Sequence, residues 1–338
     1  MNRYRVIQAL TWICSLSLVL WILQSLPLAT ILESVAGLSL WQWGLWSSLN
    51  LAIILVYVQR WRCLSVATGV DITFKHVFLL RQAGQLISFI TPGPQFGGEP
   101  FQIYWLWKRF SFPGTLAILS VALDRFFELW INFAVLLLGI VILMLTPTLG
   151  LADWSALAIA LTLMIMILSW SGWFLVSHQE KISGWIKTLG QRWQHNPQLL
   201  RIDGHWDDIG THLRRLIRSE KASLSLALFL ALLGWAGMIF EIWLLLSFFA
   251  IDPGFTALVL LVVAMRLAFL LPLPGGVGTL EAAMFWAFTG LGLPLTGAAA
   301  VIAMMRLRDS VVLLIGFFAL RRIHQVGPTE VIPVGGEK

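Results

Sequence analysis

Long apolar segments recur along this chain, and they restrict its fold more than any other feature. A membrane-spanning helix needs about 20 mostly apolar residues, and its backbone groups must be paired within the segment. We therefore expect an all-α polytopic membrane protein with about six spanning helices. The expected spans are a run of about 19 residues within positions 1–26 and, approximately, residues 41–59, 114–145, 154–176, 222–250 and 295–320.

The composition supports a membrane protein. The chain is 58% hydrophobic and 12% charged, whereas about 25% charge is usual for a soluble domain. Its net charge of +6 is also compatible with nucleic-acid binding, but the basic residues flank the apolar segments. Such residues are better explained as determinants of membrane topology, so we expect no nucleic-acid partner.

The basic residues predict the topology. Arg3 and Arg5 precede the first apolar run and place the N-terminus in the cytoplasm. That run is long for a secretory signal and lacks a following A-x-A site, so we expect an uncleaved helix. The second span, with Trp41, Trp43 and Trp46 at its outer end, should return to cytoplasmic Arg60, Arg62 and Lys75; Arg321 and Arg322 should also be cytoplasmic.

Two stretches rich in proline and glycine interrupt apolar sequence. The first is "ITPGPQFGGEP", residues 90–100, between short apolar arms at 76–91 and 101–107. These arms are shorter than a span, so we expect a re-entrant hairpin that enters from the cytoplasm. The second stretch, "PLPGGVGTLE", lies between arms at 256–271 and 282–289. The number of preceding spans predicts that this hairpin enters from outside.

The two units share a spacing pattern, P-G-x5-E followed by P-x11-R-x2-[ED]. Because the units have opposite predicted orientations, we expect an inverted-topology repeat with broken helices that line a polar site near the membrane midplane. The expected organisation is one membrane domain, 1–322, with a cytoplasmic tail, 323–338. The domain comprises repeat 1 (37–176, hairpin 76–107), a cytoplasmic amphipathic loop (177–221) and repeat 2 (222–322, hairpin 256–290).

Charged residues in apolar surroundings are the candidate site, because charge inside a membrane is costly and usually functional. They include Asp124, Glu241 and Arg308. The candidates for substrate binding are Arg81, Glu99, Arg125, Glu128, Arg266, Glu281, Arg306 and Asp309. The expected hairpin turns contain Pro92, Gly93, Gly97, Pro274, Gly275, Gly276 and Gly278.

Structural explanations exist for the same residues. Acids three positions after Arg125 and Arg306 can simply neutralise these arginines. Glu99 and Glu281 fall in first helical turns, where carboxylates cap free amides. Arg81 and Arg266 can reach the interface or pair with Glu241. In the functional reading, helix N-termini and arginines bind an anion, while carboxylates bind a cationic group or carry protons.

Other motifs point to no chemistry. "PGGVGTLE" has glycines like a phosphate loop but lacks the strand and the Gly-Lys-Ser/Thr ending. His205, Asp208 and His212 could form a metal face, although a solvated polar face explains them better. No nucleophile–base pair or zinc-protease signature is present in the sequence. We expect no cofactor, no metal and no enzymatic activity.

The segments "TPGPQFGGEP", "ALDRFFEL" and "PLPGGVGTLEAAM" resemble the lysylphosphatidylglycerol synthase transmembrane family, the flippase-like domain also found in the multiple peptide resistance factor. The resemblance covers about residues 5–322 and implies an inner-membrane protein that moves a lipid between leaflets. The first hairpin departs from the family pattern: it has Pro94 and Gln95 in the loop, and Gln102 where the family usually has arginine. It has thus lost positive charge.

The leading hypothesis is a flippase that passes a polar or anionic lipid headgroup through a midplane groove. The alternatives are a secondary transporter of a small amphiphilic solute, proton-coupled through Glu99 or Glu281, and an intramembrane enzyme or the membrane partner of a lipid-modifying enzyme. The expected partners are membrane lipids. Because the sequence ends at Lys338, we expect any lipid-modifying synthase or glycosyltransferase to be a separate protein.

Overall fold

The computed structural model describes residues 33, 35–91, 97–146, 154–177, 213, 215–271 and 273–325. Helices make up most of these ranges, which contain no strand. The expectation of an all-α polytopic membrane protein is confirmed. Several predicted features lie outside the described residues: the first span, Pro92, Gly93, most of the 177–221 loop with its His205–His212 face, and most of the tail.

Four described helices are long and apolar enough to cross a membrane. A further helix, α13 (Leu295–Gln325), equals the longest of them at 31 residues but carries the charges of Arg306, Arg308 and Asp309. The four apolar helices are α3 (Leu40–Ala67), α6 (Gly114–Met144), α7 (Ser155–Ser177) and α10 (Lys221–Phe248).

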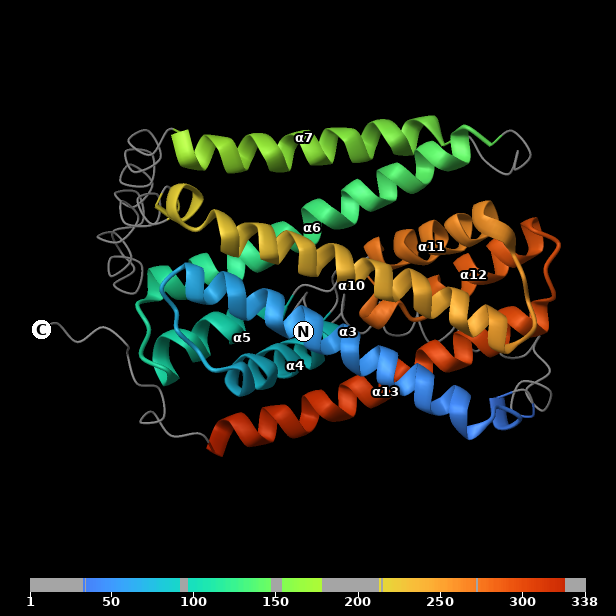
Figure 1. The fold of residues 1–338 in the computed structure, drawn as a ribbon, viewed down its shortest axis with the longest axis horizontal. Coiled ribbons are helices and arrows are strands. Elements are labelled where there is room, and N and C mark those ends of the chain that lie inside the picture. Colours follow the sequence, from blue (N-terminus) through green and yellow to red (C-terminus); the bar gives the residue numbers. More distant parts are fainter. Residues whose placement is uncertain are drawn as a thin grey trace, which may run out of the picture.

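Both interrupted stretches form helical hairpins of unequal arms. The first contains α4 (Phe74–Ile90) and α5 (Glu99–Tyr104), which continues as a π-helical turn, Trp105–Arg109. The second contains α11 (Gly254–Leu270), a short turn at Pro274–Gly276 and α12 (Thr279–Gly290). The first hairpin begins toward the left end of the molecule and the second toward the right end, and α4 and α11 both end near its middle (Figure 1).

The hairpins pack crosswise onto the two longest helices. α4, from the first hairpin, lies along α13, whereas α11, from the second, lies along α6. The second arms pack on the opposite long helices: α5 contacts α6, and α12 contacts α13. α3 and α10, which precede the two hairpins, pack on each other. Within this set, each helix of the first unit, α3–α6, therefore has contacts equivalent to those of the corresponding helix of the second unit, α10–α13.

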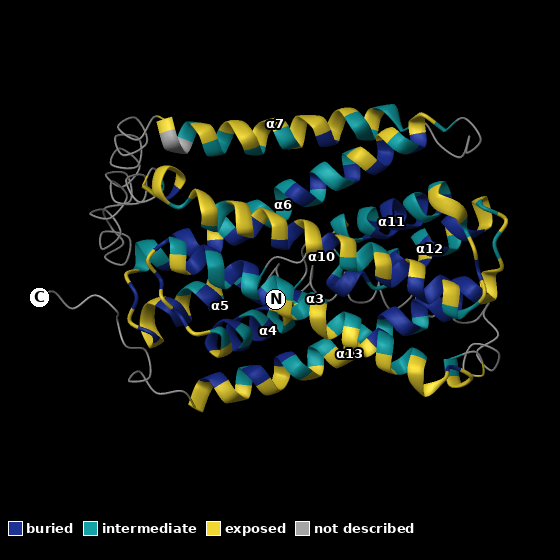
Figure 2. Ribbon diagram, in the orientation of Figure 1, coloured by how far each residue is buried: buried dark blue, intermediate teal, exposed yellow. Residues whose placement is uncertain are grey.

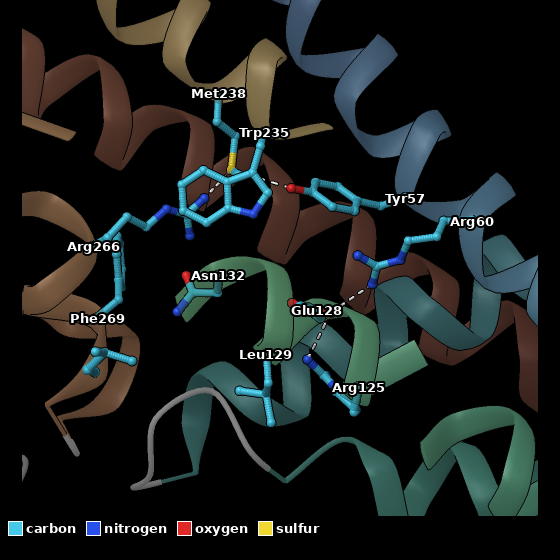
Figure 3. Close-up of a pocket in the computed structure, with 11 residues that line it drawn as sticks. Tyr57, Arg60, Arg125, Glu128, Leu129, Asn132, Trp235, Met238, Arg266 and Phe269 are labelled. Carbon is cyan, nitrogen blue, oxygen red and sulfur yellow. Dashed lines mark hydrogen bonds and ion pairs between the residues drawn. The ribbon is translucent and has the colours of Figure 1, made fainter. Parts of the chain in front are cut away.

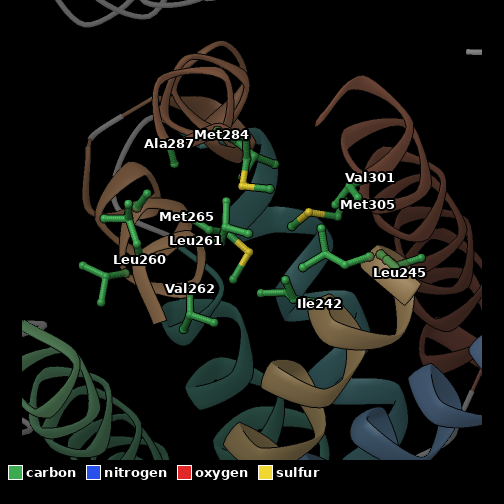
Figure 4. Packing of buried hydrophobic residues seen from close by; sticks show 14 of the residues in the cluster. Ile242, Leu245, Leu260, Leu261, Val262, Met265, Met284, Ala287, Val301 and Met305 are labelled. Atoms are coloured by element: carbon green, nitrogen blue, oxygen red, sulfur yellow. The ribbon is translucent and has the colours of Figure 1, made fainter. Parts of the chain in front are cut away.

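Buried apolar side chains fill the space around each hairpin. Figure 4 shows one cluster, in which Met265 of α11, Met284 of α12 and Met305 of α13 meet Ile242 of α10. A smaller cluster surrounds Trp61 and the α4–α5 hairpin. Much of the outside of α7 and α10 is exposed (Figure 2) and includes large apolar side chains, as lipid contact requires.

Candidate functional site

The second hairpin is tied to α13 by Arg306 and Glu281. The Nε and Nη2 atoms of Arg306 lie 2.7 and 2.9 Å from the two carboxylate oxygens of Glu281. Glu281 also accepts the backbone N–H of Gly278 at 2.8 Å, so it caps α12. Arg306 further donates to the carbonyl oxygens of Gly275 and Gly276 at the hairpin turn. One arginine thus holds both the cap and the turn.

The first hairpin repeats this arrangement. Arg125 Nε lies 2.6 Å from Glu99 Oε1, and Glu99 accepts the N–H of Gly97 at 2.8 Å. The acid three residues after the arginine also forms an ion pair: Arg125–Glu128 at 3.3 Å corresponds to Arg306–Asp309 at 3.2 Å. The arginines and acids that share offsets in the sequence therefore occupy corresponding positions in the contacts.

Arg60 joins the first ion-pair network, which corrects its expected cytoplasmic position. α3 continues to Ala67, seven residues beyond Arg60, so this side chain lies inside the bundle and is 1% exposed. Arg60 pairs with Asp124 at 2.9 Å and with Glu128 at 3.0 Å. Arg81 contacts the same two acids, at 2.9 and 3.6 Å. A basic residue after an apolar run resembles a topology signal, and no local pattern shows its distant partners.

Among the described residues, Glu241 pairs with Arg308, and not with Arg81 or Arg266, the two partners expected from the sequence. Arg308 Nη1 lies 2.6 Å from Glu241. The indole N–H of Trp46 also donates to Glu241, at 3.2 Å. Trp46 is therefore buried, not at the outer interface as expected, although nearby Trp41 is exposed.

Arg266 differs from the other arginines in the bundle interior. Its guanidinium stacks over Trp235 at 4.4 Å and contacts the sulfur of Met238. Within the described residues it forms no ion pair, and its Nε is buried without a hydrogen-bond partner. Figure 3 shows Arg266 against Trp235, with Tyr57 and Asn132 around the same space.

A cavity of about 220 Å³ lies between the hairpins and helices α3, α6, α10 and α13. A smaller cavity of about 80 Å³ adjoins it, and Arg266, Tyr57, Arg125 and Glu128 line both. The charged lining of the larger cavity consists of Arg81, Arg125, Glu128, Glu241, Arg266, Arg308 and Asp309; its polar lining is Asn50, Tyr57, Gln82, Gln85, Ser88 and Gln102.

The structure divides the expected substrate-binding residues into two groups. Five of them line the larger cavity: Arg81, Arg125, Glu128, Arg266 and Asp309. The other three, Glu99, Glu281 and Arg306, are not part of its lining and instead hold the hairpins. The sequence analysis placed Arg60 in the cytoplasm, and it counted Glu241 and Arg308 among the charges in apolar surroundings but not among the substrate-binding candidates.

Glycines permit close packing around this cavity. Gly275, with φ of +57°, lies against Phe89, and a Cβ at Gly275 would come within 2.2 Å of the Phe89 ring. Phe89 also lines the cavity, so the turn of the second hairpin supports a wall residue from the first. Gly98 similarly lies directly against the backbone of Gly84. In the described ranges, no group of three or more His, Cys, Asp or Glu residues could hold a metal ion.

Comparisons with known proteins agree with this architecture. The family model of the lysylphosphatidylglycerol synthase TM region matches residues 7–316. A UPF0104 membrane protein of Methanothermobacter thermautotrophicus is 25% identical over 267 residues, covering 75% of this chain and 77% of the relative. Another, from Methanocaldococcus jannaschii, is 25% identical over 284 residues, covering 80% and 82%. No solved structure matches the chain.

Proposed function

This chain belongs to the lysylphosphatidylglycerol synthase transmembrane family, and we propose that it moves a polar or anionic lipid between the two leaflets of a membrane. The observation that carries the proposal is the charged cavity inside a bundle whose outer surface is apolar. A lipid matches both features, because its headgroup needs polar contacts such as the cavity offers, while its acyl chains are stable in the hydrocarbon around the bundle.

The positions of the two hairpin-binding arginines suit transfer across a membrane. Arg125 lies eleven residues from the start of α6, and Arg306 lies eleven residues from the start of α13. At 1.5 Å per residue, each is about 16 Å along its helix. The two helices start at opposite ends of the molecule (Figure 1), so both arginines fall near the middle of a hydrocarbon layer about 30 Å thick.

The hairpins supply the polar path without exposing unpaired backbone groups to lipid. Glu99 and Glu281 accept the amides where α5 and α12 begin, and Arg306 binds the carbonyls of the second turn. Interrupted helices are tolerated at membrane depth where they line such a cavity. In this proposal the headgroup occupies the cavity, and opposite movements of the hairpins open it to one leaflet and then to the other.

The contacts favour lipid transfer over proton-coupled transport of a small solute. Proton coupling would require a carboxylate oxygen of Glu99 or Glu281 to become free to bind and release a proton during the transport cycle. Each of these carboxylates is instead held by an arginine and a backbone amide. Their proposed role is to position the hairpins, while Arg81, Arg125, Glu128, Arg266 and Asp309 contact the headgroup.

The proposed setting is the cell inner membrane, with both termini in the cytoplasm. Arg321 and Arg322 at the end of α13 support this orientation through the preference of basic residues for the cytoplasmic side. A separate synthase or glycosyltransferase that modifies the lipid is a proposed partner, because the family takes its name from a lipid-modifying synthase.

Reconstitution into liposomes tests the proposal. The liposomes carry fluorescent phospholipids in both leaflets, and a membrane-impermeant reductant destroys the fluorescence of those in the outer leaflet. A functional translocase brings labelled lipids from the inner leaflet to the outer one, so more than half of the total fluorescence is lost. We expect faster exchange with the wild-type protein than with protein-free liposomes or with a variant in which Arg125 and Arg81 are both glutamine. Exchange at the protein-free rate for every neutral, zwitterionic and anionic lipid would refute the proposal.

A further inference from the structure

All three carboxylates that line the larger cavity are already bound by arginine. Glu128 lies 3.0 Å from Arg60, Glu241 lies 2.6 Å from Arg308, and Asp309 lies 3.0 Å from Arg308. A cationic ligand would have to displace one of these arginines and leave its charge unpaired inside the bundle. Removing one partner of a buried pair is strongly unfavourable, so the described lining is poorly suited to a cationic group.

Arg266 offers the opposite property. Arg81, Arg125 and Arg308 of the cavity lining each form ion pairs, whereas Arg266 is the lining arginine without an ion pair in the described part of the chain. Its Nε is buried and lacks a hydrogen-bond acceptor. Such a donor is costly to leave unsatisfied, and an incoming anion would satisfy it.

The surroundings of Arg266 hold the guanidinium ready for an anion. The Cζ atom of Arg266 lies 4.4 Å from the centre of the Trp235 ring, a contact that uses none of the hydrogen-bond donors, and Nη2 donates to the Met238 sulfur. The same space is lined by Tyr57 and Asn132 (Figure 3). The Asn132 amide can donate to an anion, and the Tyr57 hydroxyl, which donates to the Met238 sulfur at 3.7 Å, can turn to a stronger acceptor such as a phosphate oxygen. A phosphate has enough acceptor oxygens to contact all three side chains.

The rest of the lining suits a neutral substituent with hydroxyl groups. Four amide side chains line the larger cavity, and the Oε1 atom of Gln82 is buried without a hydrogen-bond partner. An amide oxygen accepts a hydrogen bond from a hydroxyl group without requiring charge on the ligand. The amide side chains are those of Asn50, Gln82, Gln85 and Gln102.

We propose that Arg266 binds the phosphate of an anionic lipid headgroup, that the amide side chains bind a neutral hydroxylated substituent on that phosphate, and that the cavity discriminates against aminoacylated, cationic headgroups. This inference rests on the proposed function in taking the ligand to be a lipid. A soluble phosphate ester carries the same phosphate group, so the experiments below compare binding of the lipid with binding of glycerol 3-phosphate.

The first experiment uses the wild-type protein in detergent micelles. Binding is measured by thermal stabilisation and by competition for short-chain phosphatidylglycerol, lysyl-phosphatidylglycerol, diacylglycerol and glycerol 3-phosphate. We expect phosphatidylglycerol to bind at least about tenfold more tightly than the lysyl ester or diacylglycerol, the change expected for one charge-assisted hydrogen bond. Glycerol 3-phosphate should compete more weakly, because it lacks acyl chains. Equal or tighter binding of the lysyl ester would overturn the proposal, and tighter binding of glycerol 3-phosphate than of the lipid would overturn the lipid assignment.

The second experiment locates the anion. Arg266→Gln and Arg266→Met should each weaken phosphatidylglycerol binding at least about tenfold and reduce its preference over the lysyl ester. Arg322→Gln, which removes an exposed charge at the end of α13, is the matched control and should leave binding unchanged. Unchanged binding in both Arg266 variants would overturn the proposal. If both variants fail to fold, the wild-type competition decides.

The two proposals fail in different assays. Selective, Arg266-dependent binding without lipid exchange in liposomes would refute translocation and leave the anion site standing. Exchange of cationic lipids at an unchanged rate in Arg266→Gln would support translocation and refute the anion site.

Discussion

Arg306 and Glu281 form a two-point ion pair across the second hairpin, with N–O distances of 2.7 and 2.9 Å. The pair joins the middle of α13 to the first turn of α12. Arg125 and Glu99 make the corresponding contact at 2.6 Å between α6 and α5. Each long helix therefore holds the second arm of its own hairpin through one arginine.

Replacing Glu281 with glutamine should destabilise the protein more than replacing Glu99. The Glu281 side chain is less exposed, at 9% against 15%, and it contacts two guanidinium nitrogens of its partner. We expect Glu281→Gln to lower the free energy of unfolding by about 3 kcal/mol, because it leaves a partly buried arginine short of its partner. Glu99→Gln should cost about 1–2 kcal/mol. Denaturant titrations in detergent measure both losses.

Glu33, an exposed acid before α3, gives the matched control. Glu33→Gln should leave the free energy of unfolding within about 0.5 kcal/mol of wild type. An unfolding free energy for Glu281→Gln equal to that of the control would show that Glu281 acts as a cap alone.

Glu128 should be more sensitive than a simple i,i+3 partner of Arg125. Three arginines converge on it: Arg60 at 3.0 Å, Arg125 at 3.3 Å and Arg81 at 3.6 Å. We expect Glu128→Ala to cost about 3–5 kcal/mol. Removing Arg125 as well should restore little of that loss, because Arg60 and Arg81 remain beside the vacated position. The free energies of unfolding of Arg125→Ala, Glu128→Ala and the double variant test whether stability stays low when both residues are removed.

Glu220, which accepts a hydrogen bond from Ser223 at 2.9 Å near the start of α10, provides the control carboxylate. Glu220→Ala should cost about 1 kcal/mol or less. Wild-type stability in the Arg125→Ala, Glu128→Ala double variant would contradict the shared network and leave an isolated Arg125–Glu128 pair.

The helices and hairpins were largely predictable from sequence, because each depends on local pattern. The expected span at 114–145 is α6 at Gly114–Met144, and that at 222–250 is α10 at Lys221–Phe248. Proline and glycine mark both hairpin turns, since neither residue sustains a helix. The repeated spacing also assigned Glu99, Arg125, Glu281 and Arg306 to the polar site, and the structure pairs Glu99 with Arg125 and Glu281 with Arg306.

The remaining contacts could not be predicted, because they join residues far apart in the chain. Arg60 is 64 residues from Asp124, and Trp46 is 195 residues from Glu241. Hydropathy places both Arg60 and Trp46 at a membrane boundary, which is the usual position of such residues. Their burial follows from the packing of α3 against α10 and α6, and a single sequence carries no pattern for that packing.

A methyl group at Gly98 should destabilise the first hairpin. A Cβ there would lie 2.2 Å from the carbonyl oxygen of Gly84, and this backbone atom cannot rotate away as a side chain can. Gly98 has φ of −79°, so steric overlap alone is tested. We expect Gly98→Ala to lower the free energy of unfolding by about 1–3 kcal/mol. Gly44→Ala in α3, with nothing within 4 Å of the added Cβ, should instead be neutral or stabilising by up to about 1 kcal/mol. Equal effects of the two substitutions would mean that the arms do not pack this closely.

Contact between the two hairpins predicts energetic coupling between Gly275 and Phe89. Gly275→Ala should cost about 1–2 kcal/mol for its left-handed backbone and a further 1–3 kcal/mol, approximately, for overlap with the Phe89 ring. Removing the ring with Phe89→Ala should eliminate the second part, so the double variant should be more stable than the sum of the single losses predicts, by about 1–3 kcal/mol. Gly254→Ala separates the two contributions, because Gly254 has φ of +70° but nothing within 4 Å of an added Cβ; it should show the backbone cost and no coupling to Phe89→Ala. Additive losses for Gly275 and Phe89 would mean that Gly275 does not touch the Phe89 ring, and that the second hairpin does not support this wall of the cavity.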